Sequence, residues 1–226
     1  MGESYHLVAA LHRTPLPDQP TKRRCHNRPV TQRQARRETI EPERLIGSTT
    51  LVEGKLLVLR HDKVVDAKGE ERQREVVGHR GGVAIVALSA DRRLLLVRQY
   101  RHAVGEVLLE IPAGTLDREP DDSIEDPATA ARRELAEETG HVAGEWRALG
   151  RFYTAPGFAT EEMHLYLATE LSEIEDHGGP EEDENLELVR LPIEQALALA
   201  VGGELRDAKT LVGVLWLGRL VEAGEV

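Results

Sequence analysis

The stretch that decides the fold covers residues 114–141 and reads GTLDREPDDSIEDPATAARRELAEETGH. Its second half has the marks of a short helix, because Asp126 is a favourable N-cap and Pro127 suits the first helical position. Gly140 can adopt the left-handed conformation that commonly ends a helix. We therefore predict a helix between Asp126 and Gly140.

This predicted helix has an apolar arc beside an acidic arc at 3.6 residues per turn. The apolar arc holds Ala128, Ala131 and Leu135, and the acidic arc holds Glu134, Glu137 and Glu138. Acidic side chains one turn apart repel one another, so such an arc is most often a solvated helix face. Here it borders the apolar arc, and the glycine loop of residues 112–114 precedes the helix. Carboxylates and backbone carbonyls are ligands for Mg²⁺ or Mn²⁺, so the pattern favours a metal site.

The same stretch resembles the signature of Nudix hydrolases. That signature is a glycine, five residues, a glutamate, seven residues, and then Arg-Glu-apolar-x-Glu-Glu-x-Gly-apolar. Glu125, seven residues and RELAEETG at residues 133–140 fit it without a gap. There are two departures, since ten residues separate Gly114 from Glu125 and His141 occupies the final apolar position. The extra residues include Pro120 and predict a surface loop, which can lengthen at little cost.

The segments around the signature resemble the ADP-ribose pyrophosphatase branch of that family, and the likeness covers most of residues 50–220. The matching segments are REVV at 74–77, VRQYR at 97–101, EIPAG at 110–114, TAPGFATE at 154–161 and GELRDAKT at 203–210. Pro156, sixteen residues after Gly140, stands where the branch has its own proline. The resemblance implies a hydrolase that cleaves ADP-ribose to AMP and ribose 5-phosphate with Mg²⁺ (or Mn²⁺) as cofactor.

The resemblance also implies roles for the acidic residues. The metal ligands would be the Ala113 carbonyl, Glu134 and Glu138, with Glu137 as a second-tier ligand. Glu161 occupies the loop position that supplies the catalytic base in the branch, and its neighbour Glu162 is the alternative. An exposed loop acid without a catalytic role is the other interpretation of Glu161. Within the signature, Glu125 is expected to be structural or to lie in the outer shell of the metal. Arg133, four residues before Glu137, is expected to hold the glutamates in place.

Three further residues are candidates for substrate binding. Arg101 is the candidate phosphate clamp, because a guanidinium fork matches phosphate oxygens. Arg74 and Glu75 resemble the residues that bind the adenine end of the substrate, although an exposed pair on a β-strand would have the same pattern. In the branch the small β unit swaps across a dimer and completes the partner's site, so the resemblance implies a homodimer with a swapped N-terminal unit.

Composition excludes several classes of protein. The 226 residues are 40% hydrophobic and 31% charged, as in ordinary globular proteins, and the net charge of −11 argues against nucleic-acid binding. The single cysteine, Cys25, excludes an internal disulfide and fits the reducing cytosol, so we expect a cytoplasmic protein. No apolar run approaches the ~18 residues that cross a bilayer, so we expect no membrane span.

The chain divides into three predicted parts. Residues 1–43 are expected to be a disordered tail, because the first 40 contain eight Lys or Arg, three Asp or Glu and four prolines. Residues 44–80 are expected to form a small antiparallel β unit, with strand pieces at 56–59, 64–65 and 76–77 and a turn at Lys68-Gly69. Residues 81–226 form the expected Nudix domain, in which the acidic residues 173–187 are a mobile surface loop.

The expected domain alternates strands and helices. Strands are predicted near residues 82–88, 94–97, 107–111, 146–153, 163–168 and 186–191, and helices near 192–200 and 206–222. This alternation indicates an α/β fold, an α/β/α sandwich with a mixed sheet.

Two other functions remain open. Another sugar nucleotide, such as ADP-glucose or GDP-mannose, is the alternative substrate, because sugar contacts come from loops of variable sequence. A non-catalytic ADP-ribose sensor is the alternative class of protein. A sensor should have lost the signature glutamates, and this chain keeps Glu134, Glu137 and Glu138.

Overall fold

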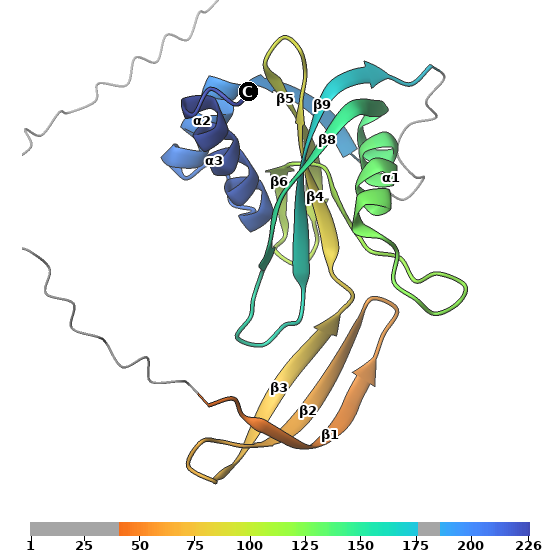
Figure 1. Ribbon diagram of the computed structural model, residues 1–226, viewed down its shortest axis with the longest axis vertical. Helices are drawn as coiled ribbons and strands as arrows, with labels where there is room; N and C mark the ends of the chain where they lie inside the picture. Colours follow the sequence, from red (N-terminus) through yellow and green to blue (C-terminus); the bar gives the residue numbers. More distant parts are fainter. Residues whose placement is uncertain (1–40, 176–185) are drawn as a thin grey trace, which may run out of the picture. The chain divides into compact units, whose positions relative to one another are not determined.

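The computed structural model describes residues 41–175 and 186–226 (Figure 1). Within them the protein is an α/β fold with a seven-stranded sheet, a separate three-stranded sheet and three helices. Residues 1–40 of the predicted tail and 176–185 of the predicted mobile loop lie outside the described residues. Disorder of the tail, mobility of the loop and the predicted domain boundaries therefore stay predictions.

The N-terminal sheet is antiparallel, with β1 (Arg44–Glu53), β2 (Leu57–Val65) and β3 (Glu71–His79) in that order. Gly69, in the predicted turn between β2 and β3, has a φ of 80° that favours glycine. The prediction of separate strand pieces at 56–59 and 64–65 was wrong, because both belong to the continuous strand β2. Strand β1 was not predicted, since two register shifts along it interrupt the alternation that marks a strand.

The main sheet has the strand order β10-β5-β4-β9-β8. These strands are β4 (Gly82–Leu88), β5 (Arg93–Arg101), β8 (His141–Tyr153), β9 (Glu162–Glu173) and β10 (Leu186–Pro192). Strand β4 pairs parallel with β9, whereas the other pairs are antiparallel, so the sheet is mixed as predicted. Every residue of β4 is buried, which explains its uninterrupted apolar sequence.

Strands β4 and β5 separate after a short paired segment, and the chain returns into the gap. Strand β6 (Glu106–Glu110) pairs with β5, and β7 (Ala113–Thr115) pairs with β4. Between them, the carbonyl of Pro112 accepts a hydrogen bond of 2.8 Å from the Ile85 N–H. The glycine loop is therefore held to β4 by backbone hydrogen bonds, and the strand before it, β6, is held to β5.

Helices cover both faces of this sheet (Figure 1). Helix α1 (Pro127–Thr139) packs on one face, and α2 (Ile193–Gly202) and α3 (Ala208–Glu222) pack on the other. Alternate residues of β4 contribute to two separate hydrophobic clusters: Val83, Ile85 and Ala87 to one, and Ala84, Val86 and Leu88 to the other. The predicted α/β/α sandwich is thus confirmed, with the separate antiparallel sheet before it.

The ends of α1 are those that the sequence predicts. The Asp126 side chain caps the helix by accepting a hydrogen bond of 3.0 Å from the Thr129 N–H. Gly140 ends it in the left-handed conformation with a φ of 67°. The buried arc, however, includes Ala130, Glu134 and Glu138. The interpretation of the acidic arc as a solvated face is therefore wrong for these two glutamates.

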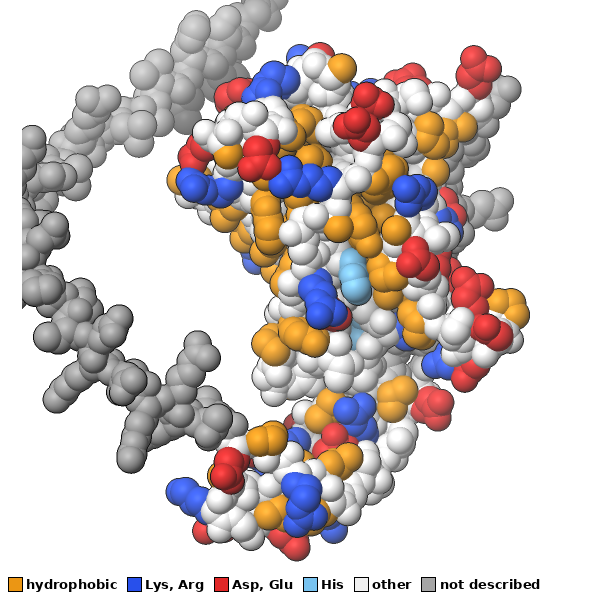
Figure 2. Space-filling view, viewed as in Figure 1, with side chains coloured by type: hydrophobic (Ala, Val, Ile, Leu, Met, Phe, Trp, Pro, Cys, Tyr) orange, Lys and Arg blue, Asp and Glu red, His pale blue; other side chains and the backbone are white. Residues whose placement is uncertain are grey.

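The charged side chains on the surface carry both signs (Figure 2). On the face that Figure 2 shows, basic and acidic side chains are interspersed, so this face offers no extended basic patch to a nucleic acid. Among the helices of the described residues, none is both long and apolar enough to cross a membrane.

Candidate active site

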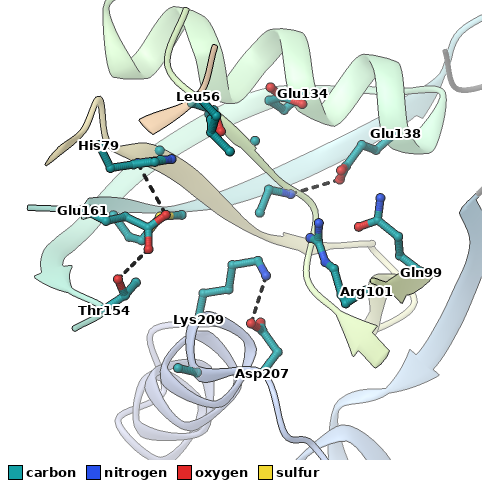
Figure 3. Close-up of a pocket in the computed structure, with 16 residues that line it drawn as sticks. Leu56, His79, Gln99, Arg101, Glu134, Glu138, Thr154, Glu161, Asp207 and Lys209 are labelled. Atoms are coloured by element: carbon teal, nitrogen blue, oxygen red, sulfur yellow. Dashed lines mark hydrogen bonds and ion pairs between the residues drawn. The ribbon is translucent and has the colours of Figure 1, made fainter. Parts of the chain in front are cut away.

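A cavity of about 510 Å³ brings together five of the residues that the sequence singles out (Figure 3). These residues are Arg101 of β5, Ala113 of β7, Glu134 and Glu138 of α1, and Glu161 just before β9. The chain folds them together because β7 is inserted beside β4, α1 crosses the sheet above it, and β9 pairs with β4 from the other side. The cavity therefore lies where the signature helix meets the sheet.

Two of the three glutamates of α1, Glu134 and Glu138, lie against the glycine loop. Glu134 is 8% exposed and Glu138 is 6% exposed, and the Ala113 N–H donates a hydrogen bond of 2.9 Å to Glu138 Oε2. A Cβ atom on Gly114 would lie 1.8 Å from Glu134 Oε1, so the carboxylate occupies space that only glycine leaves. Two buried carboxylates beside the backbone of the glycine loop form a donor set that suits a hard divalent ion.

Glu137 is placed differently from the other two glutamates. It does not line the cavity, and its side chain is 38% exposed. In the described residues, no three His, Cys, Asp or Glu side chains form a group arranged to hold a metal ion. The fit of a divalent ion therefore depends on Glu134, Glu138 and the adjacent backbone.

Arg133 connects the glutamates of the signature. Its Nη1 donates to Glu134 Oε1 at 2.8 Å and to Glu137 Oε2 at 2.9 Å, and its Nη2 donates to Glu125 Oε2 at 2.9 Å. The hydrogen bond with Glu125 is the main cause that raises the pKa of Arg133, and the same bond lowers the pKa of Glu125. Arg133 thus has the contacts of the structural role expected from its spacing.

Glu125 also fixes the lengthened loop. It is 7% exposed, and its Oε2 accepts a hydrogen bond of 3.2 Å from the Asp117 N–H. Within the loop, the bridge between Arg118 and Ile124 closes a turn whose tip is exposed. The extra residues thus extend away from the signature contacts, as expected for a surface loop.

Arg101 lines the cavity, but it is engaged by a buried carboxylate. Its Nε and Nη2 each donate a hydrogen bond of 2.8 Å to Glu110, which is 1% exposed. Lys209, near the start of α3, also contacts Glu110, and its Nζ lies 2.9 Å from Asp207 Oδ1 (Figure 3). Burial raises the pKa of Glu110, but the bonds and charges of Arg101 and Lys209 outweigh it and lower that pKa overall.

The two candidates for the base lie on different sides of the strand. Glu161 lines the cavity, whereas Glu162 does not, and Glu162 Oε1 lies 3.5 Å from Arg151 Nε. Successive residues of an extended chain point to opposite faces, which explains the difference. Glu161 Oε2 accepts a hydrogen bond from the Thr154 hydroxyl, and its Oε1 lies 3.5 Å from His79 Nδ1 (Figure 3).

Arg74 and Glu75 do not line this cavity in their own chain. Arg74 Nε donates to Glu43 Oε2 at 3.1 Å, and Glu75 Oε1 lies 3.4 Å from His61 Nε2. Both side chains are exposed on β3. Within a single chain they are thus an exposed pair on a strand, and their proposed role requires a partner subunit.

Sequence reasoning missed the cavity residues His79, Thr154 and Lys209, and it missed the buried Glu110 that holds Arg101 and Lys209. Thr154, Glu110 and Lys209 lie in the segments that resemble the ADP-ribose pyrophosphatase branch, and this resemblance was the signal that could have found them. Lys209 and Glu110 are 99 residues apart, so no local pattern pairs them. His79 stands at the end of β3, where a single polar residue carries no periodic signal.

Comparison with known proteins agrees with this geometry. Residues 78–211 match the NUDIX domain. An ADP-ribose pyrophosphatase of Bacillus subtilis (strain 168) is 37% identical over 175 residues, which cover 77% of this chain and 92% of that protein. An ADP-ribose pyrophosphatase of Mycobacterium tuberculosis is 39% identical over 170 residues, covering 75% and 80% of the two chains.

One relative is named for a different substrate, and one solved structure has a similar fold. A GDP-mannose pyrophosphatase of Salmonella arizonae is 35% identical over 164 residues, covering 69% of this chain and 80% of that one. The structure described as that of an ADP compounds hydrolase shares the fold with a TM-score of 0.70, at 23% identity, covering 84% of this chain and all of that one. The chain belongs to the NUDIX domain family, as a Nudix pyrophosphohydrolase related to ADP-ribose and GDP-mannose pyrophosphatases.

Proposed function

We propose that this protein hydrolyses the pyrophosphate of nucleoside diphosphate sugars, with ADP-ribose as its best substrate and Mg²⁺ or Mn²⁺ as cofactor. The observation that carries the proposal is that Glu134, Glu138 and Glu161 face one cavity of about 510 Å³. That volume lies within the range of sites for small-molecule ligands, roughly 300–1,000 Å³. The preference for ADP-ribose is supported by the two relatives of that name.

The residues fit a hydrolysis in which water attacks phosphorus. A divalent ion held by Glu134, Glu138 and the Ala113 carbonyl, with Glu137 in a second tier, would neutralise phosphate charge and activate the water. Glu161 accepts the proton that the water loses as the new P–O bond forms. The bridging P–O bond breaks, so ADP-ribose and water give AMP and ribose 5-phosphate.

Arg101 is proposed as the phosphate clamp of this reaction. A guanidinium has five N–H donors, and the two hydrogen bonds to Glu110 use only two of them. Glu110 fixes the direction of the guanidinium, so its other donors meet phosphate oxygens without a loss of side-chain freedom on binding.

We also propose that the active form is a homodimer in which Arg74 and Glu75 serve the partner's site. The N-terminal sheet supports this proposal, because six large apolar residues on it and on its turn between β1 and β2 are exposed: Leu45, Ile46, Leu51, Val52, Leu56 and Leu57. A three-stranded sheet with this much exposed apolar surface gains stability when a second surface covers it.

GDP-mannose is the second candidate substrate, because a relative of that name is 35% identical. The two substrates share the pyrophosphate and differ in base and sugar, so the metal and base residues serve either one. Discrimination between them falls to the groups that contact the base and the sugar.

The test is a substrate panel of ADP-ribose, ADP-glucose and GDP-mannose with purified protein and Mg²⁺, scored by chromatography of the released nucleotide monophosphate. We expect the highest kcat/KM for ADP-ribose, with AMP and ribose 5-phosphate in equal amounts. Glu138→Gln protein, purified in parallel, controls for contaminating hydrolases. Cleavage of all three no faster than by the variant contradicts the proposal, and a higher kcat/KM for GDP-mannose favours the second candidate.

A further inference from the structure

We propose that His79 and Thr154 are positioning residues that hold the carboxylate of Glu161 for proton transfer. The inference rests on the proposed role of Glu161 as the base. It assigns a role to two side chains on different elements, the end of β3 and the start of the loop between β8 and β9. Because His79 belongs to the N-terminal sheet, that sheet also contributes to the active site of its own chain.

Each oxygen of the Glu161 carboxylate has a neighbour of its own. The Thr154 hydroxyl donates to Oε2, and His79 Nδ1 lies 3.5 Å from Oε1 (Figure 3). A glutamate on a loop has three rotatable side-chain bonds, so without such neighbours its carboxylate would sample several directions. With both neighbours in place, the carboxylate is held at the cavity that also contains Glu134 and Glu138.

The backbone fixes the imidazole of His79. The Gly81 N–H donates a hydrogen bond of 3.1 Å to His79 Nδ1, so in this tautomer Nδ1 carries no proton, and the ring restricts Glu161 Oε1 by packing beside it and not by a hydrogen bond. Gly81 has a φ of 92°, and a Cβ atom there would lie 2.8 Å from the Glu162 carbonyl oxygen. The turn between the two sheets therefore packs directly against the segment that carries the base, in a conformation that favours glycine.

The loop that carries Glu161 is hydrogen-bonded to β3 next to His79. The Thr160 hydroxyl accepts a hydrogen bond of 2.9 Å from the His79 N–H and donates one of 3.2 Å to the His79 carbonyl. The Val77 N–H donates to the Phe158 carbonyl at 2.8 Å, and the Thr160 N–H donates to the Val77 carbonyl at 3.0 Å. A strand thus holds the loop, which gives the base the fixed position that proton transfer needs.

The experiment compares paired substitutions in the full-length protein. Thr154→Val removes the hydroxyl with little change of shape, whereas Thr154→Ser keeps it. His79→Gln moves the polar group away from the Nδ1 position, whereas His79→Asn keeps an amide there that can accept from Gly81. We expect Thr154→Val and His79→Gln to lower kcat by about tenfold to 100-fold, as misplacement of a catalytic group does, with KM and the Mn²⁺ dependence nearly unchanged.

Two further results identify a positioning role. Thr154→Ser and His79→Asn should recover most of the lost kcat. In the Glu161→Gln background, Thr154→Val and His79→Gln should cause no further loss, because residues that act through one group are not additive. Melting temperatures measured on all variants show whether a loss of kcat comes from unfolding, and Thr154→Val keeps the test valid if His79→Gln does not fold.

The possible failures are distinguishable. Additive losses in the Glu161→Gln background, or wild-type kcat in both Thr154→Val and His79→Gln, overturn the inference and leave the proposed function intact. Wild-type kcat in Glu161→Gln removes both the base and this inference, but the hydrolysis measured in the substrate panel stands. A wild-type protein that cleaves no nucleoside diphosphate sugar overturns the proposed function itself.

Discussion

The carboxylate of Glu134 occupies the space that a side chain on Gly114 would fill, with the position of a Cβ atom only 1.8 Å from Glu134 Oε1. The glycine of the signature and its first helical glutamate are therefore one structural unit. The lengthened loop between Gly114 and Glu125 does not enter this contact. The loop bulges outward from the bridge between Arg118 and Ile124, and Gly114 stays paired with Val83 in the sheet.

Gly114→Ala should weaken metal binding without a large loss of stability. The new methyl group displaces the Glu134 carboxylate, whose side chain can rotate away, but the displaced oxygen no longer faces the cavity. We expect the Mn²⁺ concentration for half-maximal activity to rise by about tenfold to 100-fold, the range for groups that orient metal ligands. Gly157→Ala is the matched control, because no atom lies within 4 Å of its Cβ position. An unchanged Mn²⁺ dependence in Gly114→Ala would exclude Glu134 as a ligand.

Glu138→Gln and Glu161→Gln should lose activity in different ways. Glu138→Gln removes the charge of a metal ligand, so higher Mn²⁺ should restore part of the activity. Glu161→Gln keeps the metal ligands and removes the proton acceptor, so kcat should fall by ~10²–10⁴-fold with little change in KM and no rescue by metal. Titration of Mn²⁺ against kcat for both variants separates the roles. Rescue of Glu161→Gln by Mn²⁺ would instead identify Glu161 as a ligand.

The proposed dimer predicts complementation between two inactive variants. Arg74→Ala damages the group that serves the partner's site, and Glu138→Gln damages the site in its own chain. After subunit exchange, a mixed dimer contains one site with both residues intact, so part of the activity should return. Exchange is checked independently with differently tagged subunits. Exchange without any recovery of activity would show that Arg74 does not act across the dimer.

Glu110 should make the stability of the folded protein depend on pH in the acid range. Its folded-state pKa lies below the usual 4.5, so its stabilising contribution is complete above pH 4.5 and is lost as the pH falls through the lowered value. Glu110→Gln should cost about 3 kcal/mol at pH 7, the lower end for a broken buried ion pair, since the Arg101 side chain is 40% exposed.

The corresponding measurement is urea unfolding between pH 3 and pH 7. The wild-type protein should lose stability below about pH 4.5, and Glu110→Gln should show a smaller loss over that range. Glu106→Gln is the control on the same strand, because the ion pair of Glu106 with Arg206 is exposed and contributes little. Equal pH dependence in Glu110→Gln and the wild type would assign the acid sensitivity to other groups.

The sequence by itself determined the features that depend on neighbouring residues. The caps at Asp126 and Gly140 were predictable, because capping involves residues within one turn of the helix. The apolar run at residues 82–88 predicted a strand, and the structure buries every residue of it, because apolar side chains on both faces require cover on both faces. The spacing of Glu134 and Glu138 predicted a shared helix face, and the resemblance implied a metal-binding role for that face.

Only the tertiary structure decided which distant residues meet. Glu110 is held by Arg101 and Lys209 because β6 is inserted beside β5 and α3 begins next to it. Contacts of this kind depend on strand order, and strand order leaves no periodic pattern in the residues themselves.

Tertiary contacts also decide why Arg74 and His79, both on strand β3, have different surroundings. Both are polar residues of one strand, and no local pattern distinguishes them. His79 reaches the cavity because the end of β3 pairs with the loop that carries Glu161, through the bridge between Val77 and Ala159. Arg74 lies further from that bridge and remains exposed. A side chain's neighbours across the fold are set by where its strand is attached, which the tertiary structure alone determines.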